Sequence, residues 1–182
     1  MKIAFTDGEM TNLNPKFGQL LCACVLAYNP EDDRGGRLTT LVLDDYVTQR
    51  WDDSGLARAW RDEIEQYDII VTWNGKHFDL PFLDARLGEY GLRPLQAPRH
   101  EDLMFTFRRH LRCMHIANSK LDTVARHLRL PVQKTPMIPQ QWVKAIGGHR
   151  PSYDRIITHC EHDVRVLAAA WPRAKHLVRE IK

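Results

Sequence analysis

Three apolar stretches bounded by polar and turn-forming residues lie in the first quarter of the chain, at residues 2–9, 19–28 and 38–46. Their length and composition are typical of strands. The residues between the second and third stretches are rich in Asn, Pro, Asp and Gly, which favours an antiparallel connection. We therefore expect the fold to open with a sheet.

Helical and extended patterns alternate through the rest of the chain. The spacing predicts a helix at 54–67, a strand at 67–75, a helix at 80–91, a strand at 100–107, a helix at 119–130 and a long helix at 153–178. Gly91 is expected to stop the helix at 80–91, and the helix at 119–130 is expected to be capped and to end before Pro131. Pro172 should bend or interrupt the last helix. The Pro-rich residues 130–140 are expected to form a loop that can act as a flap.

Length and composition favour one globular domain that spans residues 1–182. The chain is 43% hydrophobic, which suffices for a sizeable core at this length. No apolar run approaches the roughly 18 residues that a membrane span needs, so we expect no membrane association and a cytoplasmic location. The cysteines lack paired C-x-x-C spacing and are expected to be reduced; they are Cys22, Cys24, Cys113 and Cys160.

Charge is distributed unevenly along the chain. Residues 1–106 carry a formal charge of −7 and residues 107–182 carry +10, although the whole chain carries only +3. An acidic pocket beside a basic surface would suit a metal-dependent enzyme that acts on a polyanion. Two unrelated solvated faces would give the same numbers, so charge alone leaves both interpretations open.

Carboxylates at two places in the sequence are candidate catalytic or metal-binding residues. Asp7 and Glu9 alternate in an extended segment, so both project to one side of the strand. Asp79 lies at the start of the predicted helix that follows an apolar strand, where Asn74 and Phe78 also gather. An Asp at this point can be an ordinary N-cap, but strand-to-helix junctions are also common ligand sites in α/β sheets.

Residues 159–163 read His-Cys-Glu-His-Asp, and each of them can bind a metal. On a helix, however, only His159 and Asp163 share a face, because they are four positions apart, whereas Glu161 and His162 point elsewhere. A lone His and Asp lack the further nitrogen or sulfur ligands of a zinc site. Mg²⁺ or Mn²⁺, which prefer oxygen ligands, suit the carboxylates of Asp7, Glu9, Asp79 and Asp163 better.

With these acids in order, the chain resembles the DEDD superfamily of 3′-to-5′ exonucleases, which includes polymerase proofreading domains and the ribonucleases T and D. DGEMTNL is similar to its first motif, D-x-E-x-T-G-L, with Asn12 where glycine is usual. WNGKHFDLPFL is similar to the second motif, N-x-x-x-F-D-x-P, of family-B proofreading domains and their stand-alone relatives. The resemblance covers nearly the whole chain. It implies a ribonuclease H-like α/β fold with a mixed five-stranded sheet flanked by helices, which agrees with the predicted element order.

The third motif departs from the family pattern. One branch has Tyr four residues before the last Asp and another has His five residues before it, whereas here His159 stands four residues before Asp163. The resemblance implies that Asp7, Glu9, Asp79 and Asp163 hold two Mg²⁺ or Mn²⁺ ions. It also implies that His159 orients or deprotonates the attacking water, so that a 5′-nucleoside monophosphate leaves a 3′ end.

The resemblance also points to residues that would bind single-stranded DNA or RNA: Met10, Thr11, Leu13, Asn74 and Phe78. Simple packing is the alternative role for Met10 and Phe78. Basic residues could track the phosphates, namely Arg108, Arg109, Arg112, Arg126, Arg129 and Lys134. Replication or repair proteins are possible partners of such an enzyme, and DNA is favoured over RNA as the substrate. A catalytically silent nucleic-acid-binding module of the same fold, an exoribonuclease, or another metal hydrolase with coincident acids remain the alternatives.

Overall fold

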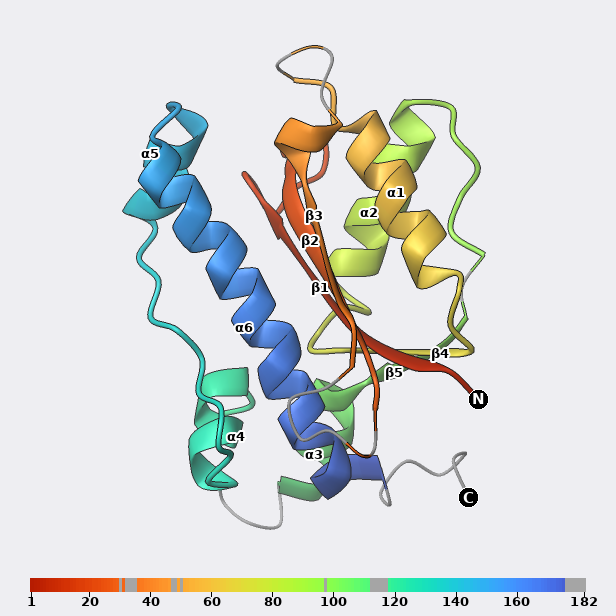
Figure 1. The fold of residues 1–182 in the computed structure, drawn as a ribbon, viewed down its shortest axis with the longest axis vertical. Coiled ribbons are helices and arrows are strands. Elements are labelled where there is room, and N and C mark those ends of the chain that lie inside the picture. The colour runs from red at the N-terminus through yellow and green to blue at the C-terminus, as the bar shows by residue number, and fades with distance from the viewer. Residues whose placement is uncertain are drawn as a thin grey trace.

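The computed structural model describes residues 1–29, 31, 36–46, 49, 51–96, 98–111 and 118–175, and its centre is a five-stranded sheet (Figure 1). The strands are β1 (Ile3–Met10), β2 (Leu20–Ala27), β3 (Leu38–Val42), β4 (Ile69–Thr72) and β5 (Arg99–Asp102). The α-helices are α1 (Ser54–Ile64), α2 (Asp79–Glu89), α3 (Leu103–Leu111), α4 (Leu121–His127), α5 (Gln140–Ile146) and α6 (Arg150–Ala174). None of the helices in these described ranges is long and apolar enough to span a bilayer.

The sheet is mixed, in the order β3-β2-β1-β4-β5. β1 pairs antiparallel with β2 and parallel with β4, so it occupies the central position; β3 lies antiparallel to β2, and β5 parallel to β4. This arrangement confirms the predicted α/β class with a mixed five-stranded sheet and flanking helices. The predicted antiparallel pairing of the second and third strands is confirmed as well.

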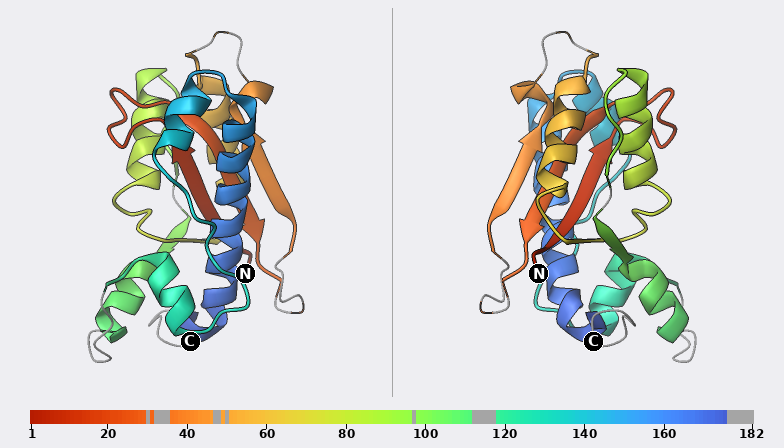
Figure 2. Two further views of the ribbon diagram at one scale, coloured as in Figure 1. Left: turned by 90° about the vertical axis from the view of Figure 1, so that its left-hand side faces the viewer. Right: turned by 90° about the vertical axis from the view of Figure 1, so that its right-hand side faces the viewer.

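Helices cover both faces of the sheet, and Figure 2 shows each face in turn. α1 and α2 pack on one face, and the long α6 packs along the other (Figure 1). Alternate β1 residues serve the two layers: Ile3 and Phe5 belong to the core beneath α6, whereas Ala4 belongs to the core beneath α1 and α2. The side-chain direction of every later β1 residue follows from this alternation.

The bounds and the number of elements differ in part from the prediction, and the helix expected to be bent or interrupted at Pro172 is not interrupted there. Only the start of the stretch at 100–107 is a strand, because α3 begins at Leu103 directly after β5. The third strand ends at Val42 and passes into a short 3-10 helix at Leu43–Asp45. Pro172 lies inside α6. The helix at 119–130 begins at Leu121 without a side-chain cap, and α5 was not predicted.

Gly8, between the two acids of β1, is required by packing on the α1 face. The Trp60 ring of α1 is fully buried against this strand, and its indole N–H donates to Thr6 Oγ1 at 2.8 Å. A Cβ added at Gly8 would lie 2.5 Å from Cη2 of Trp60. The absence of a side chain at Gly8 therefore admits the tryptophan ring.

Replacing Gly8 with Ala should therefore destabilise the protein by roughly 1–3 kcal/mol, the usual cost of overpacking a core. Gly88→Ala is the matched control, because Gly88 lies inside α2 and a Cβ there meets nothing within 4 Å. That control should gain about 0.5–1 kcal/mol. Urea unfolding of the three proteins measures both effects, and equal stability of Gly8→Ala and the wild type would contradict the packing argument.

Candidate active site

β1 places Asp7 and Glu9 on the α6 face of the sheet. They follow Ile3 and Phe5 in the alternation, and the buried Cys160 on α6 donates its thiol hydrogen to the backbone carbonyl of Asp7 at 3.4 Å. Both carboxylates keep partial exposure at the end of the strand. The predicted common face of the two acids is therefore present.

Asp79 reaches the same strand end from α2. It is the first residue of that helix, but Phe78 is the N-cap and no side chain caps the helix. The Asp79 carboxylate instead turns toward the sheet, where Oδ1 accepts the backbone N–H of Gly8 at 3.0 Å, and it is 6% exposed. The structure thus excludes the N-cap alternative for Asp79.

A strained loop between β4 and α2 directs Asp79. Asn74 has a positive φ of 65°, and a Cβ at Gly75 would lie 2.5 Å from Thr72 Oγ1, which explains the Asn-Gly sequence at this turn. The Asp102 carboxylate at the end of β5 accepts the backbone N–H of Asn74 at 2.9 Å and that of Lys76 at 3.0 Å. Sequence reasoning missed Asp102, since nothing in its own segment shows that the chain turns back onto it.

α6 supplies His159 and Asp163, which are both 4% exposed. Nε2 of His159 lies 3.9 Å from Oδ2 of Asp163, so the i, i+4 pair does share a face. The predicted apolar stripe beside it is fully or almost fully buried and consists of Cys160, Val164, Leu167 and Trp171. This stripe fixes the rotation of the helix and thereby directs the pair toward β1.

The other two polar residues of this stretch point elsewhere. Glu161 accepts the hydroxyl hydrogen of Thr40 on β3 at 2.7 Å. His162 buries its Nδ1 without a hydrogen-bond partner. The predicted divergence of the consecutive residues is therefore seen in the structure.

Residues 134–142, which we call the clasp, run from the loop after α4 into α5. They contact two of the four carboxylates, those of Asp163 and Glu9. Lys134 forms an ion pair with Oδ2 of Asp163. Sequence analysis assigned Lys134 to phosphate tracking, but its ammonium group lies against this carboxylate. The clasp therefore contributes a positive charge to the site itself.

Two further clasp residues contact the site. Thr135 Oγ1 lies 2.5 Å from Nδ1 of His159. The indole N–H of Trp142 donates to Oε2 of Glu9 at 3.2 Å. Neither residue could be predicted from the sequence, because the loop has no periodic pattern and its position depends on tertiary packing.

One pocket of about 560 Å³ collects most of the predicted site residues. Its lining includes all four carboxylates and four of the expected nucleic-acid contacts: Asp7, Glu9, Asp79, Asp163, Met10, Leu13, Asn74 and Phe78. Lys134 also lines the pocket, whereas His159 is not among its lining residues. The His159 ring lies between Thr135 of the clasp and Asp163. The geometry is that of an acidic pocket with apolar walls.

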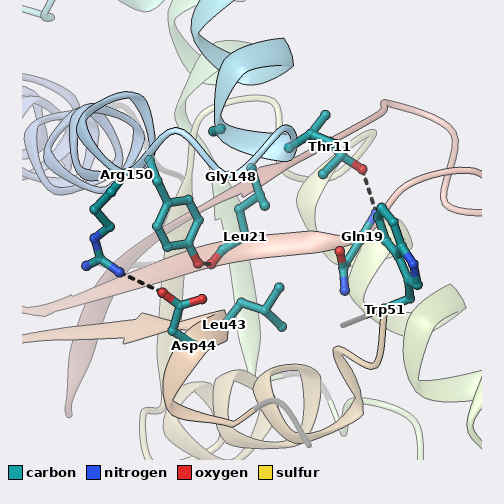
Figure 3. A pocket seen from close by; sticks show the side chains of 11 residues that line it. Thr11, Gln19, Leu21, Leu43, Asp44, Trp51, Gly148 and Arg150 are labelled. Atoms are coloured by element: carbon teal, nitrogen blue, oxygen red, sulfur yellow. Dashed lines mark hydrogen bonds and ion pairs between the residues drawn. The ribbon is translucent and has the colours of Figure 1, made fainter. Parts of the chain in front are cut away.

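Thr11, the fifth expected nucleic-acid contact, lines a second and smaller pocket of about 190 Å³ (Figure 3). Its hydroxyl accepts the backbone N–H of Gln19 at 2.9 Å, and its own N–H donates to the Gln19 carbonyl. The structure thus shows Thr11 closing the loop between β1 and β2.

The described basic residues named from the sequence come from α3, α4 and the segment after α4. Arg108 and Arg109 on α3 and Arg129 after α4 are exposed. Arg126 pairs with Asp122 within α4. Arg112 lies outside the described residues, as does Cys113.

Burial dominates the electrostatics of the acids. It raises the pKa of Glu9 to about 8, with the Asp163 charge adding to the effect while Lys134 and the Trp142 hydrogen bond oppose it. Burial likewise raises the pKa of Asp79 to about 7, against the hydrogen bond from Gly8. The pKa of Asp7 is raised well above its ordinary value by burial and then by the neighbouring carboxylates. The surroundings therefore do not fully stabilise the ionised form of these three carboxyl groups.

The basic groups respond to the same environment. Burial acts to lower the pKa of Lys134, but the charge of Asp163 and its hydrogen bond outweigh this and raise the pKa above the ordinary lysine value. For His159, burial lowers the pKa below its ordinary value despite the opposing charge of Asp163. Lys134 is thus held as a cation, and His159 is favoured as a neutral ring near pH 7.

The donor set fits a hard divalent cation. Carboxylate oxygens are the preferred ligands of Mg²⁺ and Mn²⁺, and Oδ1 of Asp163 is buried with no hydrogen-bond partner among the described residues. Within the described ranges, no three His, Cys, Asp or Glu side chains are already close enough to hold an ion. Binding would therefore require the carboxylates to converge and Lys134 to give up its place on Asp163.

Comparison with known families agrees with the fold. The model of the RNase H superfamily matches residues 4–170, so the chain belongs to that superfamily. A sequence search of curated proteins finds no match to this chain.

A solved structure has the same architecture. The family B DNA polymerase from the hyperthermophilic archaeon Pyrobaculum calidifontis matches with a TM-score of 0.72 at 18% sequence identity. The match covers 95% of this chain but only 24% of the polymerase, so the chain corresponds to about a quarter of that protein. At 18% sequence identity, this structural similarity shows a common fold and nothing further.

The raised pKa values of the acids predict how stability depends on pH. A group whose pKa is raised on folding binds more protons in the folded state, so its contribution is present at low pH and is lost as pH rises through the folded pKa. For Asp79 and Glu9 that loss begins near their unfolded pKa values of about 4 and is nearly complete at about pH 7 and pH 8. The pKa of His159 is lowered on folding, so its contribution to stability increases as pH rises. This change takes place mainly below its unfolded pKa of about 6.5.

The melting temperature in EDTA should therefore fall between about pH 6.5 and 8, and Asp79→Asn should reduce the slope. Asn cannot titrate but can still accept the Gly8 N–H, so the comparison isolates one carboxylate. Differential scanning calorimetry of both proteins measures the two slopes. Identical slopes, or a melting temperature that rises over this range, would contradict the assigned pKa directions.

Proposed function

We propose that the protein is a metal-dependent 3′-to-5′ exonuclease of the DEDD type, with residues 1–182 forming one exonuclease domain. It hydrolyses single-stranded nucleic acid, with DNA favoured, and releases 5′-nucleoside monophosphates. The observation that carries the proposal is that Asp7, Glu9, Asp79 and Asp163, from three different elements, line one pocket. Membership of the RNase H superfamily supports a nuclease activity.

The four carboxylates would hold two Mg²⁺ or Mn²⁺ ions. Asp7 would be a ligand of both, because the other three carboxylates line the same pocket around it. Two such ions, when bound, stabilise the attacking and leaving oxygens of a phosphodiester displacement. Lys134, once it leaves Asp163, remains at the pocket wall as a cation for the substrate phosphate.

His159 would act on the attacking water through Nε2, the ring nitrogen on the Asp163 side. Its Nδ1 faces Thr135 Oγ1, which can accept the ring N–H and so leave the lone pair on Nε2. The 3.9 Å separation leaves no direct hydrogen bond between Nε2 and Asp163. The lowered pKa keeps the ring neutral near pH 7, as a proton acceptor must be.

The apolar walls of the pocket support a single-stranded end as substrate. Leu13 and Phe78 line it and are 68% and 39% exposed, and Met10 lies beside them. Exposed apolar and aromatic side chains of this kind can stack against or separate the last bases of a strand. Asn74 lines the same pocket and could hydrogen-bond to the terminal nucleotide.

The preference for DNA rests on the second motif, which resembles proofreading domains, and the structural match to a DNA polymerase supports it. An enzyme of this kind would act with replication or repair proteins in the cytoplasm. An exoribonuclease would use the same site, so the substrate must be tested directly.

Labelled oligonucleotides test the proposal. With Mg²⁺ or Mn²⁺, a 3′ label on single-stranded DNA should appear early as a mononucleotide, and a 5′ label should give a shrinking ladder. Single-stranded RNA and duplex DNA should react more slowly. Asp7→Asn should lose the activity below detection while keeping its circular dichroism spectrum, because an uncharged amide cannot bridge two ions.

Four outcomes would count against this assignment. Cleavage of a closed single-stranded circle would show an endonuclease. Binding of the strand without hydrolysis would favour a silent module of the same fold, and faster release from RNA would favour an exoribonuclease. Full activity in Asp7→Asn would exclude the two-ion arrangement.

The assignment of His159 can be tested against its neighbour. His159→Ala should lower the rate by roughly 10² to 10⁴, the usual contribution of a general base. His162→Ala should change it little, since that ring does not share the face of Asp163. His159→Tyr, which restores the residue common at this spacing, should keep part of the activity by orienting water. Equal and severe losses in both alanine variants, together with bound zinc, would instead support a metal cluster on α6.

A further inference from the structure

Trp142 joins two residues of the proposed site that come from different elements. Its indole N–H donates to Oε2 of Glu9 on β1 at 3.2 Å. The same ring lies edge-on to the His159 ring of α6, with 6.3 Å between ring centroids and 88° between planes. One side chain of the clasp therefore touches both the carboxylate and the histidine.

The packing of α5 fixes the Trp142 ring. Met137, Trp142 and Ala145 are partly buried and pack against the core on the α6 side of the sheet. α5 ends at Ile146 with Gly147 as its C-cap, and the positive φ of Gly148, 89°, turns the chain directly into α6. The indole is thus held by apolar contacts that do not depend on Glu9.

The hydrogen bond restricts how Glu9 can present its oxygens. An indole N–H can only donate, so it holds Oε2 as an acceptor and opposes a proton at that atom. Within the described ranges, the indole N–H is the hydrogen-bond donor to Glu9, and Oε1 has no hydrogen bond to the protein. The carboxylate is therefore oriented with one oxygen fixed and one available.

We infer that Trp142 is a positioning residue: it orients Glu9 so that Oε1 is presented to a divalent cation. Hydrogen bonds from outside the ligand set orient metal-binding side chains, and their loss typically costs about 10- to 100-fold in metal affinity. The inference rests on the proposed function, because it requires Glu9 to be a metal ligand. It adds a residue that neither the motifs nor the superfamily match indicates.

Trp142→Phe is the direct test, because it keeps an aromatic ring against His159 and the core but removes the N–H. Mn²⁺ binding to the protein without nucleic acid is measured by the electron paramagnetic resonance signal of free Mn²⁺. The dissociation constant should rise about 10- to 100-fold. Val143→Ala is the matched control: Val143 is the next residue of α5 and is 70% exposed, so its affinity should equal that of the wild type.

A Glu9→Gln background separates orientation of Glu9 from packing. If the effect of Trp142 runs through the carboxylate, Trp142→Phe should change Mn²⁺ affinity by less than about twofold once Glu9 is replaced, as a double-mutant cycle requires. A further large loss in that background would show that Trp142 acts through His159 or the core. That result would overturn the inference.

The remaining outcomes distinguish the inference from the proposed function. If the wild type binds Mn²⁺ and Trp142→Phe binds it equally well, the positioning role is wrong and the exonuclease proposal stands. If the wild type does not bind Mn²⁺ at millimolar concentration, the metal-dependent function is wrong, and the role of Trp142 fails with it. Melting temperatures of all variants confirm that each is folded.

Discussion

The concentration of carboxylates at the end of β1 is the constraint on which the rest of the site depends. Asp7, Glu9, Asp79 and Asp163 come together in a partly buried pocket, and burial raises the pKa of the first three. Among the described residues, Lys134 is the cation that pairs with one of them. A folded protein keeps such an arrangement only if a further positive charge, or protons, offsets the cost of desolvation. The divalent cation of the proposed function would meet that requirement.

The surrounding fold serves to hold these charges in place. The Trp60 ring requires glycine at position 8, and this glycine offers its N–H to Asp79. Apolar packing sets the rotation of α6, while Asp102 pins the loop that carries Asn74. Each acid is thus positioned by an element that apolar packing or backbone hydrogen bonds hold in place. These contacts bring the carboxylates together although their charges repel.

Much of this was accessible from the sequence. Period-two alternation predicts the common face of Asp7 and Glu9, and i, i+4 spacing predicts that of His159 and Asp163; both are seen in the structure. The contacts of Lys134, Thr135 and Trp142 were not accessible, because the loop after α4 has no periodic pattern and its path is set by tertiary packing. The segment that holds Asp102 was predicted as a continuous strand, since its apolar residues fit both a strand and the start of α3.

The most direct test of this account is a crystal structure of the protein soaked in Mn²⁺, with the ions located by anomalous scattering. The account predicts Mn²⁺ in the pocket, bound by oxygens of Asp7, Glu9 and Asp163 with Asp79 beside them. The ammonium group of Lys134 should have moved away from Asp163. A pocket without Mn²⁺ at saturating concentration, with the ion pair between Lys134 and Asp163 intact, would contradict the claim that these four acids form a metal site.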